Sequence, residues 1–258
     1  MCGICGILYL DGTPARREEV EPMLALLVHR GPDQGDIIVD GCCALGNRRL
    51  AIQDLSADGA LPMRSVDDRL IIAYNGEIYN HPQIRHGLEL EGLRYRTSSD
   101  TESLLKLYRR DGVEMMRSLR GMFAFALWER EQQKLLVARD RMGEKPLYYY
   151  ADSHIFVFAS EIKALLAHPA VPRESAFDTS TLALYLGYGY VPTPNTAFKG
   201  IKVLPPGHLI ELQPSASREV QPRPYWTPPH PVGTANVSPA LEREKIGSLG
   251  EALGEAVR

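Results

Sequence analysis

The residues at the start of the chain could do chemistry together. The sequence begins Met1-Cys2-Gly3, and removal of Met1 by an aminopeptidase would leave Cys2 with a free α-amino group beside its own thiol. The reference pKa is about 7.7–8.0 for such an amine and about 8.5 for a thiol, so both groups exchange protons near neutral pH. A terminal amine activates an N-terminal threonine in the same way. Cys2 is therefore a candidate nucleophile that carries its own general base.

A cysteine near the start can also be an incidental residue, because chain ends often fray. The residues that follow favour an ordered start. Ile4, Ile7 and Tyr9 alternate with smaller residues, a pattern that predicts a β-strand directly after Cys2. A strand within a sheet would hold the thiol and the amine in a fixed place.

The four cysteines could also form a metal site or a redox pair, but their spacing disfavours both. The chain contains Cys2, Cys5, Cys42 and Cys43. Adjacent residues of a strand point to opposite faces, so Cys42 and Cys43 cannot easily share one tetrahedral zinc site. No helix that would lower a thiol pKa follows Cys2. We expect no metal site, and we expect Cys5, Cys42 and Cys43 to be small core residues.

The overall composition is that of an ordinary soluble protein. Of the 258 residues, 44% are hydrophobic and 24% are charged, and the formal net charge is −3. This balance gives no broad surface for nucleic acid. No apolar run is long enough to cross a bilayer, and no secretory signal precedes the first strand, so we expect a cytoplasmic protein without a membrane partner.

The apolar periodicity predicts strands in hairpin-like groups, separated by helices. Helices are predicted at 20–30, 80–90, 101–110, 161–166 and 179–186, and strands at 4–9, 37–39, 42–49, 70–74, 122–128, 134–139, 147–150, 155–159 and 208–212. Grouped hairpins favour antiparallel sheets covered by helices over a doubly wound parallel sheet.

The C-terminal part of the sequence differs from the rest. Residues 213–240 are rich in proline and predict a linker. Residues 241–257 form one amphipathic pattern with nothing in this chain to pack against. We therefore expect a first domain at 1–212, a linker at 213–240 and the first helix of a truncated second domain at 241–258.

A series of short motifs follows in a fixed order along residues 2–212. It includes Cys2-Gly3-Ile4, His29-Arg30-Gly31-Pro32-Asp33, Asn75-Gly76-Glu77-Ile78-Tyr79, Ser99-Asp100-Thr101-Glu102, Lys145-Pro146-Leu147-Tyr148-Tyr149 and Leu204-Pro205-Pro206-Gly207-His208. Together they resemble the amino-terminal glutaminase domain of glutamine-dependent asparagine synthetases, a class II glutamine amidotransferase of the N-terminal-nucleophile hydrolases. The resemblance implies an α+β fold, a four-layer αββα sandwich of two stacked antiparallel sheets flanked by helices.

The resemblance also implies the reaction, the hydrolysis of L-glutamine to glutamate and ammonia. Cys2 would attack the side-chain amide of glutamine and form a thioester. The Asn75 side chain and the Gly76 backbone N–H would stabilise the oxyanion. From the residues alone, Asn75-Gly76 after a strand favours a turn, because Asn-Gly is a strong hairpin dipeptide.

The same resemblance assigns a clamp for the free amino acid. Arg49 would bind the α-carboxylate through its planar guanidinium, while Asp100 and Glu77 would bind the α-ammonium group. The alternatives are a helix N-cap for Asp100 and a surface ion pair for Arg49. Arg30 and Asp33 are expected to brace the pocket, His29 is expected to play no direct part, and Lys145 is expected to support the site or an interface.

Relatives of this kind carry a second domain that activates aspartate with ATP and Mg²⁺, through a loop of the Ser-Gly-Gly-Leu-Asp-Ser type. This sequence contains no such motif, so we expect no cofactor for this chain itself. Its partners would be L-glutamine and its own C-terminal synthetase domain, and a homodimer is a candidate assembly. Two alternatives stay open: an asparagine-synthetase-like enzyme that acts on another acid, and a non-catalytic module that keeps the fold.

Overall fold

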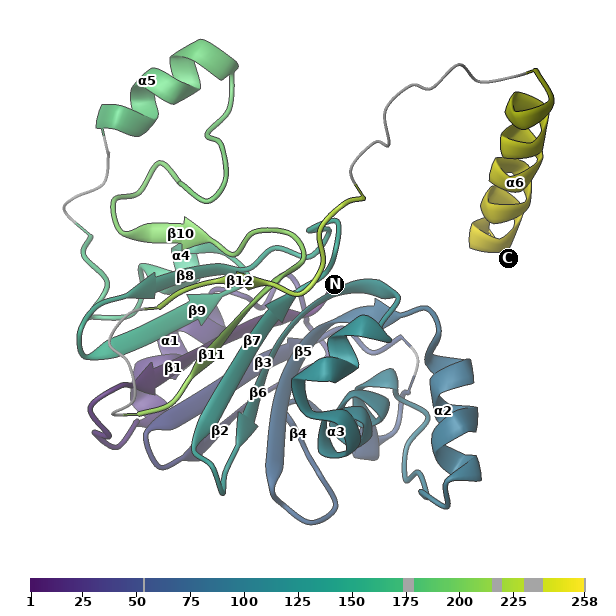
Figure 1. Cartoon of the computed structure of the whole chain (residues 1–258). Helices are drawn as coiled ribbons and strands as arrows, with labels where there is room; N and C mark the ends of the chain where they lie inside the picture. The colour runs from purple at the N-terminus through teal and green to yellow at the C-terminus, as the bar shows by residue number, and fades with distance from the viewer. Residues whose placement is uncertain (53, 174–178, 215–219, 230–238, 258) are drawn as a thin grey trace. The chain divides into compact units, whose positions relative to one another are not determined.

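Two antiparallel sheets form the centre of the fold (Figure 1). The computed structural model describes all residues except 53, 174–178, 215–219, 230–238 and 258. Within these residues the first sheet has the order β10 (Ile201–Val203), β8 (Tyr148–Ala151), β9 (Ile155–Ala159), β1 (Gly3–Tyr9), β3 (Cys43–Arg49) and β2 (Gln34–Asp40). The second has the order β12 (Arg223–Pro224), β11 (His208–Leu212), β7 (Lys134–Arg139), β6 (Gly121–Glu129), β5 (Leu70–Ile78) and β4 (Met63–Arg64).

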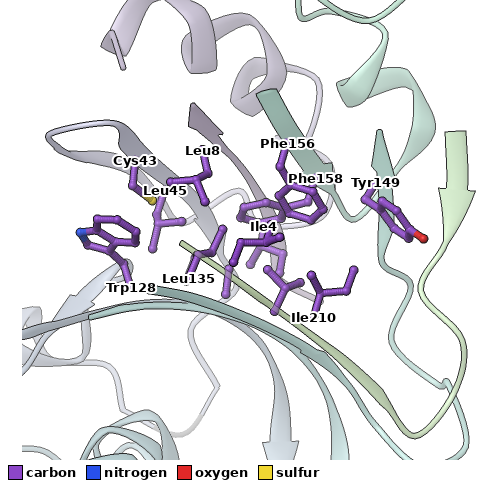
Figure 2. Close-up of a cluster of buried hydrophobic side chains, with 14 of the residues drawn as sticks. Ile4, Leu8, Cys43, Leu45, Trp128, Leu135, Tyr149, Phe156, Phe158 and Ile210 are labelled. Carbon is purple, nitrogen blue, oxygen red and sulfur yellow. The ribbon is translucent and has the colours of Figure 1, made fainter. Parts of the chain in front are cut away.

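The side chains between the two sheets make the central core (Figure 2). Ile4 and Leu8 of β1 and Phe156 of β9 come from the first sheet, and Trp128 and Ile210 come from the second. All five are almost fully buried. Burial of one such side chain contributes about 1.5–3 kcal/mol, so this layer fixes the sheets face to face.

Helices cover the outer face of each sheet. α1 (Arg17–Ala25) and α4 (Ile162–Leu165) pack on the first sheet, where Cys5 and Ile7 of β1 point outward. α2 (His81–Leu90), α3 (Asp100–Asp111) and the 3₁₀ helix η2 (Gly112–Arg117) pack on the second sheet against Phe123 and Phe125 of β6. The alternation of inward and outward residues along β1 and β6 follows the two-residue period of a strand. The predicted four-layer αββα sandwich is confirmed.

The structure corrects two element boundaries. α1 ends at Ala25 rather than near residue 30. β5 does not stop at Asn75-Gly76 but continues to Ile78, because Asn75 and Gly76 pair with Ala124 and Phe123 of β6. The predicted turn at this dipeptide is therefore wrong. A Cβ on Gly76 would lie 2.4 Å from the Met122 carbonyl oxygen, so glycine is what allows β5 and β6 to pair closely here.

The sequence predicts the strand at 208–212 as the last one, but the structure has a further strand after it. β12 pairs with β11, and the Tyr225 hydroxyl donates to the Arg139 carbonyl oxygen at 2.9 Å. The first compact unit accordingly spans Met1–Thr227, and the second spans Pro228–Arg258. The second unit contains α6 (Pro239–Val257). The domain limits at 212 and 240 stay predictions.

Cys5, Cys42 and Cys43 are buried in the hydrophobic core, as predicted. α5 (Thr179–Tyr188) and the short 3₁₀ helix η1 (Ala57–Gly59) complete the elements of the first unit. Among the described helices, none has both the length and the apolar character that a bilayer crossing requires.

Asn47 of β3 joins the two sheets through its carboxamide. It is fully buried. Its Oδ1 accepts a hydrogen bond from the Tyr74 N–H of β5 at 2.7 Å, and its Nδ2 donates to the carbonyl oxygens of Arg48 (3.0 Å) and Gly3 (3.4 Å). This bridge sets the position of β5 relative to the start of β1.

We expect Asn47→Ala to lower the free energy of unfolding by about 1–3 kcal/mol, because the buried Tyr74 amide loses its acceptor. Urea denaturation followed by circular dichroism measures the change. Asn195→Ala is the matched control at an exposed position, where about 0.5 kcal/mol or less is expected. Equal stability of the two variants would show that the bridge does not stabilise the fold.

Candidate active site

One pocket of about 130 Å³ lies where the start of β1 meets the end of β5. It is lined by all of the predicted catalytic and substrate-binding residues: Cys2, Arg49, Asn75, Gly76, Glu77 and Asp100. These residues come from both sheets and from α3, and they are far apart in the sequence. The fold therefore brings the complete predicted set to a single cavity.

Cys2 is held by contacts on both of its sides. Its Sγ accepts a hydrogen bond from the Leu50 N–H at 3.4 Å, and its carbonyl oxygen accepts one from Arg30 Nε at 3.0 Å. Arg30 in turn pairs with Glu161 at 3.0 Å. Burial raises the pKa of the Cys2 thiol, although the Leu50 hydrogen bond opposes this effect. The thiol therefore stays protonated at neutral pH and needs a base before it can attack.

The neighbouring motif residues brace the site. Asp33 accepts a hydrogen bond from the Ala51 N–H at 2.9 Å, next to the segment that contacts Cys2. Together with the Arg30 contact, this agrees with the predicted bracing role of Arg30 and Asp33. His29 is half exposed and contacts Glu161 at 2.9 Å. That His29 plays no direct part in catalysis stays a prediction.

The backbone of β5 presents a row of N–H groups toward the pocket. Phe123 of β6 exchanges two hydrogen bonds with Asp140, at 3.2 and 2.8 Å, so its backbone groups point away from β5. Gly76 of β5 lies opposite Phe123 in the register of the two strands. The two residues therefore form a non-hydrogen-bonded pair, and the Gly76 N–H points away from β6. This edge of β5 borders the cavity, because Gly76 lines it.

The two neighbouring amides on this edge have acceptors. The Tyr74 N–H donates to Asn47, and the Ile78 N–H donates to Asp100 Oδ2 at 2.9 Å. The Gly76 N–H lies midway between them in the strand, and residues two apart in a strand face the same way. It is therefore positioned to donate to a group that enters the pocket.

Asn75 supplies a second donor beside Gly76. It is 1% exposed, and its Nδ2 has no hydrogen-bond partner among the described residues. A buried amide group without a partner costs about 1–3 kcal/mol, so native proteins rarely keep one without a functional reason. A bound oxygen atom between Asn75 Nδ2 and the Gly76 N–H would satisfy both donors.

Asp100 is the first residue of α3 and not its N-cap. Ser99 caps the helix, because its side chain accepts from the Thr101 N–H, so the capping alternative for Asp100 is wrong. The Asp100 carboxylate accepts from the Tyr74 hydroxyl at 2.6 Å and from the Ile78 N–H at 2.9 Å. Burial raises the pKa of Asp100, while these two hydrogen bonds lower it. A buried carboxylate in this setting suits a cationic group of a ligand.

Arg49 ends β3 and is 8% exposed. Its guanidinium donates to the carbonyl oxygen of Asp54 and, at 3.5 Å, to that of Ser56. Within the described part of the chain it forms no ion pair, so the alternative of a surface ion pair is wrong. The positive charge therefore remains available to a ligand carboxylate.

Three further pocket residues, Asp54, Thr101 and Lys145, were not predicted to line the pocket. Asp54 accepts hydrogen bonds from Ser56 and Ser98, which lower its pKa to about 2, and it fixes the loop that Arg49 contacts. An Asp-x-Ser turn was the only local signal for it. Thr101 also lines the cavity. Lys145 is a pocket residue as well, and its Nζ lies 3.4 Å from the Met1 sulfur.

Comparison with known proteins identifies the family. The family model described as a glutamine amidotransferase domain matches residues 1–226. The chain belongs to this glutamine amidotransferase family. Asparagine synthetase (glutamine-hydrolyzing) 1 of Bacillus subtilis is 37% identical over 83% of this chain and 34% of its own length. Amidase chyE of Penicillium rubens is 34% identical over the whole chain and 38% of its own length.

The chain spans about a third to a half of the length of the curated relatives that it matches. A solved structure of glutamine phosphoribosylpyrophosphate amidotransferase from B. subtilis superimposes with a TM-score of 0.63 at 21% identity, over 88% of this chain and 50% of that one. At this identity the likeness concerns the fold alone, two stacked antiparallel sheets covered by helices. The reaction type of the glutamine amidotransferase family is therefore consistent with the thiol and the hydrogen-bond donors of the pocket.

The raised pKa of Cys2 predicts how its alkylation depends on pH. Only the thiolate reacts, so the rate with iodoacetamide should still rise above pH 8.5, where an ordinary thiol is half ionised. Mass spectrometry of the chain with Met1 attached measures the rate, and Cys2→Ala is the control because the other cysteines are buried. A rate that levels off below pH 8 would contradict the prediction.

Proposed function

We propose that this chain hydrolyses L-glutamine and supplies ammonia as the N-terminal glutaminase part of an asparagine synthetase. The observation that carries the proposal is the convergence of Cys2, the unpaired Asn75 amide and the buried Arg49 and Asp100 on one cavity. Hydrolysis of the side-chain amide of a free amino acid requires a nucleophile such as a thiol and donors that stabilise the oxyanion. It also requires charged groups that bind the α-carboxylate and the α-ammonium group.

The reaction begins when Met1 has been removed. The α-amine of Cys2 takes the thiol proton, and the sulfur attacks the carboxamide carbon of glutamine. The negative oxygen lies between Asn75 Nδ2 and the Gly76 N–H. The C–N bond then breaks, the amine returns the proton to the nitrogen, and ammonia leaves. A water molecule attacks the thioester by the same route and releases glutamate.

The substrate is recognised by charge at its other end. The guanidinium of Arg49 pairs with the α-carboxylate, and its planar fork matches the two carboxylate oxygens. Asp100 and Glu77 bind the α-ammonium group. Because Asp100 is buried, an α-ammonium partner offsets the cost of its charge. A simple amide without these two groups would gain neither contact.

Met1 affects the pocket in two ways. While it is attached, the terminal amine belongs to Met1 and not to Cys2. Its side chain also lines the cavity beside Lys145. Removal of Met1 would therefore free the base and enlarge the space for glutamine.

The ammonia would serve a synthetase domain of the same protein, which uses ATP and Mg²⁺ to activate aspartate. The greater length of the relatives supports this partner, since the matched part is a third to a half of each. The region described here would then need no cofactor of its own. The homodimer and the cytoplasmic location stay predictions.

A second candidate function concerns the acceptor of the ammonia. Two matched relatives of similar identity are named amidases, chyE of Penicillium rubens and chry2 of Gibberella zeae. The acceptor of this protein is then an acid other than aspartate, with the same glutaminase chemistry. Assays of the complete protein with aspartate and with other carboxylic acids distinguish the two candidates.

We expect Cys2→Ala to abolish glutamate release from glutamine and Asn75→Ala to lower kcat about 10²–10³-fold, as for other oxyanion donors. A coupled glutamate dehydrogenase assay measures both. Asn195→Ala is the matched asparagine control at an exposed site. Full activity of Cys2→Ala would refute the proposed function, and an inactive wild type would support a non-catalytic module.

A chain extended by one residue before Cys2 should be inactive, because the extension acylates the base. Protease removal of the extension should restore glutamate release, and intact mass confirms the new terminus. Equal activity before and after cleavage would show that the Cys2 amine is not the base.

A further inference from the structure

A second and larger cavity lies away from the active site. Its volume is about 590 Å³, within the range of small-molecule sites. It is bordered by the turn between β4 and β5, by the segment after α2 and by one side of α3, and these elements lie together in Figure 1. We call it the α3 groove. Nothing in the glutaminase chemistry uses it.

The α3 groove is basic although the chain as a whole is acidic. Its wall carries six cationic side chains, Arg64, Arg94, Arg96, Lys106, Arg109 and Arg110. The acidic ones are Asp67, Glu91 and Glu102. The excess of three positive charges contrasts with the net charge of −3 of the whole chain.

Most of these cations have ion-pair partners. Lys106 pairs with Glu102, Arg109 with Asp67, Arg110 with Glu91 and Arg64 with Asp68. In the described part of the chain, neither Arg94 nor Arg96 forms an ion pair, and both side chains are exposed. Arg96 Nη2 donates to the Arg64 carbonyl oxygen at 3.4 Å, a contact that leaves its charge unbalanced. The two guanidinium groups, whose charges no described carboxylate balances, therefore give the groove its capacity to bind an anion.

The shape and charge of the groove select the class of ligand. Two guanidinium groups match a phosphate monoester, which carries about −1.5 to −2 charges at pH 7 and accepts two-pronged hydrogen bonds from arginine. The side chains of Leu93, Leu105 and Val66 add apolar wall. We propose that the α3 groove binds a phosphate monoester whose organic group packs on this apolar wall, as the base of a nucleoside monophosphate would.

The groove is connected to the active site by hydrogen bonds. The Glu102 carboxylate accepts from the backbone N–H of Arg96 at 3.0 Å and from that of Thr97 at 2.8 Å. The next residue, Ser98, donates its N–H to Asp54 at 2.9 Å, and the Asp54 carbonyl oxygen accepts from Arg49. A ligand on Arg94 and Arg96 therefore orders the segment that holds the loop at Arg49.

Calorimetric titration with AMP tests the site without any assay of glutamine hydrolysis. We expect saturable binding of AMP that is tighter than that of inorganic phosphate or of adenosine, since each lacks one half of the ligand. The double variant Arg94→Ala/Arg96→Ala should bind AMP at least about tenfold more weakly, because both charge-assisted contacts are lost.

Arg117→Ala is the matched control, since it removes an exposed arginine of η2 and should leave AMP binding unchanged. Circular dichroism and the unfolding midpoint check that each variant is folded. Absence of saturable binding, or equal binding by the double variant and the wild type, would overturn the proposal. Equal weakening by Arg117→Ala would also overturn it, because binding would then follow only the overall charge.

The link to Arg49 rests on the proposed function and has a separate test. Saturating AMP should lower the KM for glutamine by about fivefold, the lower end of typical coupling, in the wild type and not in the double variant. A KM that does not respond to bound AMP would overturn the link.

Discussion

The candidate active site depends on one open edge of β5. β6 pairs with β5 along its full length, whereas β4 pairs only with its first part, at Ile71 and Ile72. Beyond β4 the outward N–H groups of β5 need other partners, because unpaired buried amides are costly. Asn47 satisfies the amide of Tyr74, and Asp100 satisfies that of Ile78. The amide of Gly76 lies between them and is positioned for substrate.

The same edge explains the electrostatics of the pocket. Burial raises the pKa of the Cys2 thiol and that of Asp100, so the pocket disfavours the charged forms of both groups. Glutamine would bring a carboxylate to Arg49 and an ammonium group to Asp100, and it would exclude further water. The free energy of binding would thereby offset the cost of charged groups in a buried site.

Local patterns predicted much of the fold but only part of the site. The alternation in β1 and β6 and the cap of α3 depend on neighbours in the sequence, and the structure agrees with them. The end of β5 was wrong because pairing with β6 overrides the turn preference of Asn75-Gly76. Arg49 and Asp100 were assigned only through resemblance, and Asp54 was missed, because their meeting is set by tertiary contacts that no local spacing records.

If Cys2 is the nucleophile, it forms a covalent bond with the acyl part of glutamine. Acid quenching of the Met1-free protein during turnover, followed by peptide mass spectrometry, measures this directly. We expect a glutamyl thioester on the peptide that contains Cys2, and none in Cys2→Ala. Glutamate release with an adduct on another residue, or undiminished release from Cys2→Ala, would contradict it.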